Sequence, residues 1–470
     1  MLETIKGVKN EAPFYYFEKI SKIPRASGNE AAVADYILNF AKDLGLFAYK
    51  DESNNVLVVK EASKGRENEP SIMLQAHTDM VAEKNVSTVH DFEKDEIKLI
   101  QEGNILRADG TTLGADDGFG VAIMMSVLAD NSLSTPRLEC LFTSSEEIGL
   151  VGASKFNYSE IKSRRMINLD SAEEDTVIIG CCGGIRTELD IPVSFECGSF
   201  EGYRLIIGGL CGGHSGEDIN KNRLNAHILM GKLLTLANST TPIYLSYING
   251  GDKDNAIPRE CEAVFACDKI DISFEEYARS FLMANEDNDL FVKVERCSIS
   301  KIMSSCDTEK IIKALSIPNA ILKFREVPPI LPESSRNLAR VRTNDNMVSI
   351  CFSSRSYYDS GLNESTSFLD SLASELGGST YHHERYPGWA SDKDSALVVD
   401  YQNAFEKVSG KRPVATLIHA GLECGLISGE LPGLVAISVG CNVHDLHTPK
   451  ETMELDSLDK VYEAIIEVLK

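Results

Sequence analysis

The chain has 470 residues, 43% of them hydrophobic, and 71 Asp and Glu against 47 Lys and Arg give it a formal net charge of -24. This length and composition predict a large buried core divided over two or three domains. An acidic surface of this kind repels phosphate backbones and anionic lipids, so nucleic acid and membranes are disfavoured as partners.

The first third of the chain alternates strand-like and helix-like segments. Short apolar runs at 71–76, 138–143 and 166–169 predict strands that are buried on both faces. The apolar segment 119–128 is compatible with a helix, and Asp116-Asp117-Gly118 precedes it as a helix-start signal. This alternation predicts an α/β domain with a mostly parallel sheet and helices on both faces.

The middle of the chain has a different pattern. From about residue 186 to about residue 388, longer alternating strands are interleaved with helices such as 223–236 and 365–376. Strands that return between helices predict α+β layers, with an antiparallel sheet covered on one face.

The end of the chain returns to the first pattern. An apolar strand is expected at 434–439 and an amphipathic closing helix at 455–470. We therefore expect one α/β domain, formed by residues 1–185 and 389–470 and interrupted by a large inserted α+β domain of residues 186–388.

Acidic residues and histidines stand where the predicted strands end or where the predicted helix begins. Because open α/β sheets carry their sites beyond the carboxyl ends of the strands, we expect five separate segments to meet at one edge. A single His-x-Asp or Glu-Glu pair is more often a surface or core feature, but the shared edge favours a site. The segments are His77-Thr78-Asp79, Asp116, Glu146-Glu147, Asp170 and His447.

These side chains have the chemistry of a two-metal hydrolase. Imidazole and carboxylate groups bind cations such as Zn²⁺ or Mn²⁺, and two histidines with three carboxylates suffice for two metals if one carboxylate bridges. Two such ions polarise a carbonyl group and lower the pKa of a bridging water. A further carboxylate can take the proton of that water and pass it to a leaving amine.

Seven segments together resemble the aminoacylase/carnosinase superfamily of co-catalytic zinc peptidases, and within it most closely the aminoacyl-histidine dipeptidases. The resemblance implies hydrolysis of Xaa-His type dipeptides such as β-alanyl-histidine, with two divalent metal ions per chain, Zn or else Mn or Co. It also implies an inserted domain that acts as a lid, a small peptide substrate and a homodimer. The segments are Gln75–Val81, Thr112–Gly118, Thr143–Gly149, Asn168–Ser171, Gly212–Gly216, His419–Gly425 and His447–Pro449.

The resemblance implies a metal-binding role for five residues. His77 and Asp170 would hold one metal, Glu147 and His447 would hold the other, and Asp116 would bridge the two. We find no departure from the family pattern at these positions.

The resemblance also implies three catalytic residues. Asp79 would fix the tautomer of the His77 imidazole. Glu146 would be general base and then general acid while a metal-bridging hydroxide attacks the carbonyl. His214, in the inserted domain, would stabilise the oxyanion; the alternative is a structural histidine.

Four further residues are candidates for substrate binding. Asn255 and Arg355 resemble lid residues that contact substrate, and an arginine fork suits a C-terminal carboxylate. His419 and Glu423 are expected to line the substrate pocket. Ordinary surface roles for the first two, and a buried structural role for Glu423, remain alternatives.

Other functions stay open at this point. An N-acyl amino-acid deacylase or a tripeptidase would use the same metal residues, because specificity depends on the lid and the pocket. A non-enzymatic metal-binding scaffold is disfavoured because a structural site needs neither Glu146 nor Asp79. Catalysis by a cysteine nucleophile has no Cys–His arrangement to support it.

The cysteines and the N-terminus bear on the compartment. Twelve cysteines are scattered without a Cys-x-x-Cys pair, which predicts reduced, mostly buried thiols and disfavours a zinc finger or a thioredoxin. No signal-peptide pattern opens the chain, and no apolar run approaches the roughly 18 residues that span a bilayer. We therefore expect a cytoplasmic protein.

Overall fold

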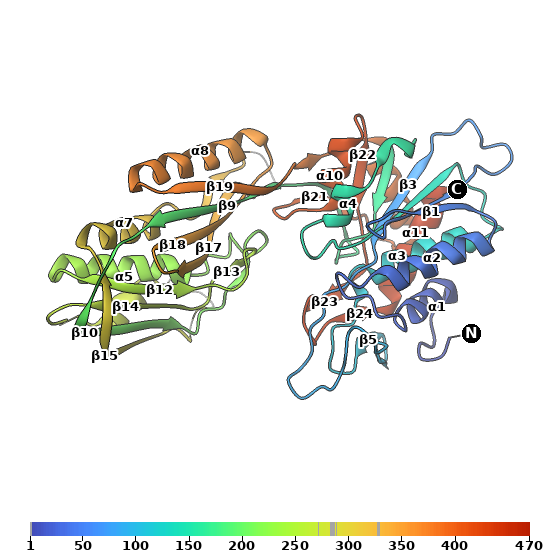
Figure 1. Cartoon of the computed structure of the whole chain (residues 1–470). Coiled ribbons are helices and arrows are strands. Elements are labelled where there is room, and N and C mark those ends of the chain that lie inside the picture. Colours follow the sequence, from blue (N-terminus) through green and yellow to red (C-terminus); the bar gives the residue numbers. More distant parts are fainter. Residues whose placement is uncertain (1, 271, 283–286, 288, 327–329) are drawn as a thin grey trace. The chain divides into compact units, whose positions relative to one another are not determined.

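The computed structural model describes residues 2–470 except 271, 283–286, 288 and 327–329. The chain forms two compact units, which are drawn in sequence colours in Figure 1. Unit 1 contains the chain up to Cys181 together with Trp389–Leu417 and Leu422–Lys470. Unit 2 contains Cys182–Gly388 and the short segment Ile418–Gly421.

The sheet of unit 1 is parallel at its centre and antiparallel at its flanks. The four central strands β6, β3, β7 and β22 are paired in parallel, and the flanking pairs are antiparallel. The predicted α/β class is therefore confirmed, with a mixed sheet. The strand order is β1 (Phe47–Lys50), β2 (Val56–Lys60), β6 (Leu138–Thr143), β3 (Ile72–His77), β7 (Arg165–Asn168), β22 (Val435–Ser438), β8 (Thr176–Cys181) and β20 (Trp389–Ala390), and β21 (Val414–Ile418) also pairs with β8.

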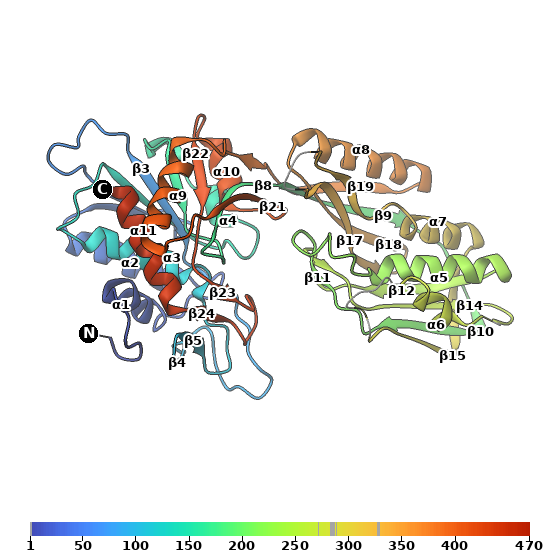
Figure 2. The ribbon, with the colours of Figure 1, turned by 180° about the vertical axis from the view of Figure 1, so that it is seen from behind.

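Helices lie on both faces of this sheet (Figures 1 and 2). One face shares a single apolar cluster with five helices, and Phe14, Val121 and Leu74 belong to that cluster. Helix α10 contacts α4 and β22 on the opposite face. The helices of the first face are α1 (Glu11–Ile20), α2 (Ala31–Asp43), α3 (Ala115–Ala129), α9 (Ala396–Ser409) and α11 (Leu455–Leu469); those of the second are α4 (Val151–Lys155) and α10 (Glu423–Glu430).

The sheet of unit 2 is antiparallel in its described pairs, as predicted. Its strands and four helices, α5 (Ala226–Thr240), α6 (Phe274–Arg279), α7 (Ser305–Leu315) and α8 (Asp359–Leu376), share one apolar cluster. The strand order is β15 (Phe291–Met303), β10 (Phe195–Gly208), β14 (Cys261–Ala266), β12 (Tyr244–Gly250), β17 (Pro332–Thr343), β18 (Met347–Ser356), β9 (Gly183–Pro192) and β19 (Ser379–Tyr386), and β16 (Ala320–Phe324) also pairs with β17.

Two small sheets complete the fold. In unit 2, β11 (Gly213–His214) pairs with β13 (Ala256–Ile257). In unit 1, four short strands form the other small sheet. In the sequence, these strands lie near residues of the predicted site. Their order is β23 (Val443–His444), β24 (Thr452–Glu454), β5 (Ile105–Ala108) and β4 (Leu99–Glu102).

Most predicted elements are present with small shifts at their ends. Strand β6 has the predicted bounds, and α11 begins where predicted. Helix α5 begins at Ala226 rather than at 223, because the Asn225 side chain accepts hydrogen bonds from the first backbone N–H groups and so caps the helix there. Helix α8 begins at Asp359, earlier than the predicted 365.

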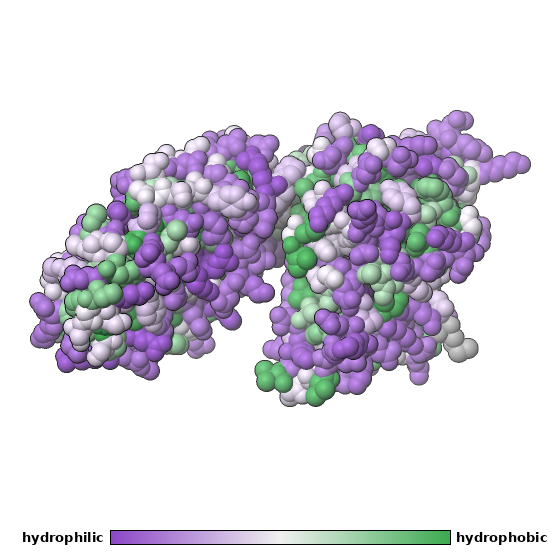
Figure 3. Space-filling model, in the orientation of Figure 1, coloured by the Kyte–Doolittle hydropathy of each residue, from purple (hydrophilic) through white to green (hydrophobic). Residues whose placement is uncertain are grey.

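The face seen in Figure 3 is mostly hydrophilic, with scattered apolar patches. Among the helices of the described residues, none is both long enough and apolar enough to cross a bilayer.

Candidate metal centre

Three neighbouring parallel strands deliver acidic and imidazole side chains to one edge of the unit 1 sheet. His77 is the last residue of β3, Asp170 follows β7, and Glu146 and Glu147 follow β6. His447 comes from the loop between β23 and β24, with a left-handed φ of 61°. The sheet edge therefore gathers residues that are far apart in sequence.

Asp116 lies between the two histidines. It stands at the start of α3 with a non-helical backbone (φ -79°, ψ 112°). Its Oδ1 is 3.0 Å from His77 Nε2, and its Oδ2 is 3.2 Å from His447 Nε2. Each oxygen of one carboxylate therefore faces a different imidazole, which is the arrangement of a bridging ligand.

Two groups of three side chains share this carboxylate. His77, Asp116 and Asp170 form one group, and Asp116, Glu147 and His447 form the other; within each group the donor atoms lie within 4.8 Å of one another. His77 Nε2 is 3.7 Å from Asp170 Oδ1, and His447 Nε2 is 3.0 Å from Glu147 Oε1.

These spacings and donor types fit a pair of metal ions. Ligand atoms that are 2.0–2.1 Å from a tetrahedral zinc ion lie about 3.3–3.4 Å from each other. The measured donor separations of 3.0–3.7 Å surround this value. The donors are imidazole nitrogens and carboxylate oxygens, which suit zinc or manganese.

The same contacts shift the protonation of the metal-free site. Burial alone would lower the pKa of His447, but the Asp116 and Glu147 carboxylates raise it to about 11. For His77 too, burial acts downward, and the carboxylates of Asp116 and Asp170 leave its pKa well above the usual range. Burial, helped by Asp116, raises the pKa of Asp170 to about 8. Protons therefore occupy donor atoms that a cation would otherwise use.

Asp79 connects one histidine to the loop of the two glutamates. It is fully buried, and its Oδ1 is 3.4 Å from His77 Nδ1. The same carboxylate accepts hydrogen bonds from the backbone N–H groups of Glu146 (3.0 Å) and Glu147 (3.3 Å). It can thus orient the imidazole and the β6 loop together.

Glu146 lies beside the two groups of donors. Its carboxylate forms a further possible set of metal donors with His77 and Glu147. Burial raises the pKa of the Glu146 carboxyl well above its usual range, and the charges of Glu147 and Asp170 act in the same direction. A carboxyl group with a raised pKa can both accept and return a proton near neutral pH.

Unit 2 brings His214 and Arg355 together. Arg355 on β18 is 4% exposed, and its Nη2 lies 3.2 Å from His214 Nε2. Its other hydrogen bonds go to Tyr386 Oη (2.9 Å) and Ser215 Oγ (3.4 Å). The Cys182 thiol also contacts the guanidinium, and the charge of Glu217 acts on it, but none of the hydrogen-bond partners is a carboxylate.

The other two unit 2 candidates lie close to this pair in the fold. Asn255 is exposed and precedes β13, and its carbonyl accepts a hydrogen bond from the N–H of Ser215 (2.8 Å). His419 is 5% exposed, and its Nε2 is 2.8 Å from Ser335 Oγ. Burial, with the charge of Arg355, lowers the pKa of His419 to about 3, so this imidazole is neutral.

Glu423 lies inside unit 1 rather than at a surface. It is fully buried at the start of α10, and its Oε2 accepts hydrogen bonds from Thr143 Oγ1 (2.7 Å) and Gln75 Nε2 (2.5 Å). Its contacts are with side chains of the protein, and a role in substrate binding stays a prediction.

Four residues near the candidate sites were not singled out from the sequence. Asp117 is fully buried, and its carboxylate accepts from the N–H of His77 (3.3 Å) and of Gly120 (3.1 Å). Tyr386 forms a hydrogen bond with Arg355. Arg25 and Glu451 form hydrogen bonds with backbone groups of the loops next to His77 and Asp116. Two of the four carried a signal: Asp117 directly follows Asp116, and Glu451 is an acid in the same loop as His447.

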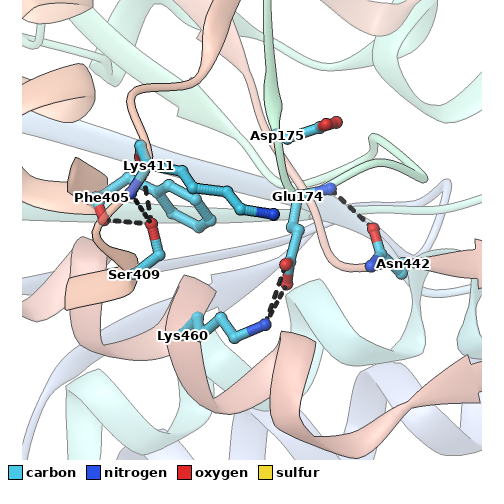
Figure 4. A pocket seen from close by; sticks show the side chains of 7 residues that line it. All are labelled: Glu174, Asp175, Phe405, Ser409, Lys411, Asn442 and Lys460. Carbon is cyan, nitrogen blue, oxygen red and sulfur yellow. Dashed lines mark hydrogen bonds and ion pairs between the residues drawn. The ribbon is translucent and has the colours of Figure 1, made fainter.

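A separate cavity of about 220 Å³ lies in unit 1 and contains none of the predicted site residues. In Figure 4 the Glu174 carboxylate points toward Lys460, and their closest N–O distance is 2.9 Å. The opposite charges of Glu174 and Lys460 therefore offset each other within the cavity. The lining residues are Glu174, Asp175, Phe405, Ser409, Lys411, Asn442 and Lys460.

Comparison with known proteins gives consistent matches over most of the chain. The model of peptidase family M20/M25/M40 matches residues 73–470. The cytosol non-specific dipeptidase of Escherichia coli (strain K12) is 36% identical over 467 residues, covering 97% of this chain and 96% of that protein.

Solved structures match the same fold. The aminoacylhistidine dipeptidase from Vibrio alginolyticus is 31% identical with a TM-score of 0.82, covering 99% of this chain and 98% of that one. A tripeptidase from Staphylococcus aureus is 17% identical with a TM-score of 0.58 over 98% of both chains, which shows a shared fold alone.

Proposed function

Because this chain belongs to peptidase family M20/M25/M40, we propose that it is a metal-dependent dipeptidase that hydrolyses the peptide bond of short peptides. The observation that carries the proposal is the shared carboxylate of Asp116, with one oxygen facing His77 and the other facing His447. The two full-length relatives named above are both dipeptidases, and one of them is named for aminoacyl-histidine substrates.

The metal ligands in this proposal are the five donors of the two groups. His77 and Asp170 would hold one ion, Glu147 and His447 would hold the second, and the Asp116 carboxylate would contribute to both. The mixed nitrogen and oxygen donor set supports zinc, with manganese or cobalt as alternatives. When bound, such a pair polarises the substrate carbonyl and makes water nucleophilic at neutral pH.

The proton transfers are assigned to Glu146. Its carboxylate takes a proton from the attacking water and returns it to the departing amine nitrogen. Asp79 keeps the His77 imidazole and the Glu146 backbone in fixed relation, since it contacts both. His214 is assigned to the oxyanion of the tetrahedral intermediate.

The substrate contacts are assigned to residues of unit 2 and to Glu423, which lies shortly after the unit 2 segment Ile418–Gly421 in the sequence. Arg355 is a buried guanidinium whose hydrogen-bond partners include no carboxylate, so we assign the substrate carboxylate to it. Asn255 and His419 are assigned to the remainder of the substrate, in keeping with their positions near His214 and Arg355. For Glu423 a substrate contact remains the weaker assignment, because the side chain is fully buried.

Cellular setting and assembly complete the proposal. A cytoplasmic location is supported by the name of the Escherichia coli relative. The family resemblance leads us to propose a homodimer, and light scattering on the intact protein would measure its mass.

Hydrolysis of a small substrate panel tests the proposed function. The panel contains β-alanyl-histidine, other dipeptides, a tripeptide and an N-acetyl amino acid, with Zn²⁺, Mn²⁺ or Co²⁺ supplied after chelation. We expect cleavage of dipeptides that is lost with chelator and restored by metal. Preference for the tripeptide or the N-acetyl substrate would point to a tripeptidase or a deacylase, and metal binding without any cleavage would point to a scaffold.

A further inference from the structure

The loop that carries Asp116 is held by a buried glutamate from another part of the chain. Glu451 is 2% exposed, and its carboxylate accepts hydrogen bonds from four consecutive backbone N–H groups. These belong to Leu113 (2.8 Å), Gly114 (3.1 Å), Ala115 (2.8 Å) and Asp116 (3.4 Å). A carboxylate thus fixes the backbone directly before the bridging side chain.

Glu451 belongs to the loop of His447. It follows His447 in the connection between β23 and β24, and its own N–H donates to the carbonyl of Thr448 (3.0 Å). The hydrogen bonds of this one side chain therefore tie the His447 loop to the Asp116 loop.

A buried arginine holds the Asp116 loop from a different direction. Arg25 is 2% exposed, and its Nη1 donates to the carbonyl oxygens of Thr78 and Asp79 at 3.0 Å each. Its Nη2 donates to the carbonyl oxygen of Gly114. Arg25 therefore ties the loop directly after His77 to the Asp116 loop.

The hydrogen bonds of both side chains go to backbone groups, while their opposite charges also attract each other. The hydrogen bonds of Arg25 go to carbonyl oxygens and those of Glu451 go to N–H groups. Hydrogen bonds to an ionised partner are roughly twice as strong as neutral ones. Buried charges of this kind hold a backbone more firmly than neutral side chains of the same length would.

We infer that Arg25 and Glu451 are positioning residues for the two metal ions, each acting on a different one. Arg25 fixes Asp116 against His77, and Glu451 fixes Asp116 against His447. The inference rests on the proposed function, because it presumes that the two donor groups hold ions. Residues behind metal ligands typically change metal affinity by about 10- to 100-fold when altered.

Metal titration of the intact protein tests the inference. Metal-free protein is titrated with Co²⁺, followed by its absorption spectrum and by calorimetry. His77→Ala and His447→Ala identify which binding phase belongs to which donor group. We expect Glu451→Gln to weaken Co²⁺ binding at the donor group of His447 about 10- to 100-fold, while binding at the donor group of His77 keeps wild-type affinity. We expect Arg25→Lys to weaken Co²⁺ binding at the donor group of His77.

Two matched controls separate this effect from the loss of any buried charge. Glu139 is fully buried on β6, and its carboxylate also accepts backbone N–H groups, those of Lys162 and Ser163. Arg336 is 3% exposed and likewise donates to a backbone carbonyl, that of Pro318 (3.4 Å), as well as to Ser365 Oγ (2.9 Å). Glu139→Gln and Arg336→Lys should leave both Co²⁺ phases unchanged.

Folding and rescue keep the test decisive. Glu451→Asp keeps both carboxylate oxygens, so its metal affinity should lie between that of wild type and that of Glu451→Gln. If Glu451→Gln does not fold, Glu451→Asp takes its place in the test. Excess metal in the assay should restore kcat to Glu451→Gln, because its defect is in metal affinity.

Each of the other possible results of the titration contradicts either the inference or the proposed function. If wild-type protein binds two ions and the Glu451 and Arg25 variants bind them equally well, or if both phases weaken together in each variant, the inference is wrong and the proposed function stands. If wild-type protein does not bind two ions, the proposed function fails first.

Discussion

Glu146 is the residue on which the proposed chemistry depends most directly. Glu146→Gln keeps the size of the side chain and removes its ability to accept a proton, so kcat should fall by about 10²- to 10⁴-fold. Because Asp79 bonds to the backbone N–H of residue 146 rather than to its side chain, the metal content should stay at the wild-type value. Elemental analysis beside the kinetics measures both. Full activity in this variant would remove Glu146 from the proton-transfer role.

The protonation of the metal donors predicts how the metal-free protein responds to pH. The pKa of His447 is about 11 and that of Asp170 is about 8, both above their ordinary values. The folded state therefore binds more protons than the unfolded state near and above neutral pH, and this stabilisation is lost as the pH rises toward the raised values. We expect the Tm of chelator-treated protein to fall between about pH 6 and pH 9.

The zinc-loaded protein provides the comparison for that measurement. Metal ligation needs deprotonated donors, so bound metal replaces the protons and the gap in Tm between loaded and metal-free protein should widen with pH. His447→Ala should flatten the curve of the metal-free protein. A metal-free Tm that rises across this range would show that the histidines are not held as cations.

At the level of elements, buried polar side chains cross-link the three strands that lead into the site. Gln75 on β3 receives a hydrogen bond from Asn168 on β7 (2.6 Å) and donates one to Glu423, which also accepts from Thr143 on β6. All four side chains are fully buried. Gln75 stands two positions before His77 on the same face of β3, and Asn168 is the last residue of β7, two positions before Asp170.

Two variants of Glu423 test this cross-link. Burial raises the pKa of Glu423 to about 7, so part of the population is already neutral at neutral pH. Glu423→Gln should therefore change the stability little, whereas Glu423→Leu removes the buried acceptor that Gln75 and Thr143 share and should cost about 1–3 kcal/mol. Denaturant unfolding of the metal-loaded protein measures the difference. Equal loss in the two variants would mean that volume rather than hydrogen bonding matters at this position.

The same elements show which features the sequence could reveal. Strands β3, β6 and β7 were predictable because each is a short apolar run, and the site residues His77, Glu147 and Asp170 stand at or shortly after their ends. Arg25 and Glu451 could not be found in this way. Their partners are backbone atoms of distant loops, and no side-chain pattern in the sequence records a backbone contact.

For the molecule as a whole, the proposal assigns metal chemistry to unit 1 and recognition of the substrate carboxylate to Arg355 in unit 2. Arg355→Met should reduce kcat/KM for a dipeptide roughly 10- to 100-fold, as expected for losing hydrogen bonds between charged groups. The same dipeptide with an amidated C-terminus should be a poor substrate for wild type and no worse for the variant. If the variant still discriminates between acid and amide, the carboxylate binds elsewhere.

The two-unit organisation was visible in the sequence as a change of strand pattern, but its boundaries were not fully visible. The short segment Ile418–Gly421 belongs to unit 2 although it lies within the C-terminal part of the chain. The backbone N–H of Cys182 donates to the carbonyl of Ala420 (3.1 Å), and His419 contacts Ser335. Four residues are too few to carry a periodic pattern, so only the folded chain reveals this excursion.

The strands that flank unit 2 also have a consequence for how such a chain can change over evolutionary time. Strand β8 ends at Cys181 and β20 begins at Trp389, and these two residues are register partners in one antiparallel pair. The chain departs and comes back at adjacent points, so a deletion of everything between them could be closed by a short peptide without rethreading the remaining sheet. The intervening segment is in this sense a cassette, which a gene could gain, lose or exchange while the surrounding sheet keeps its connectivity.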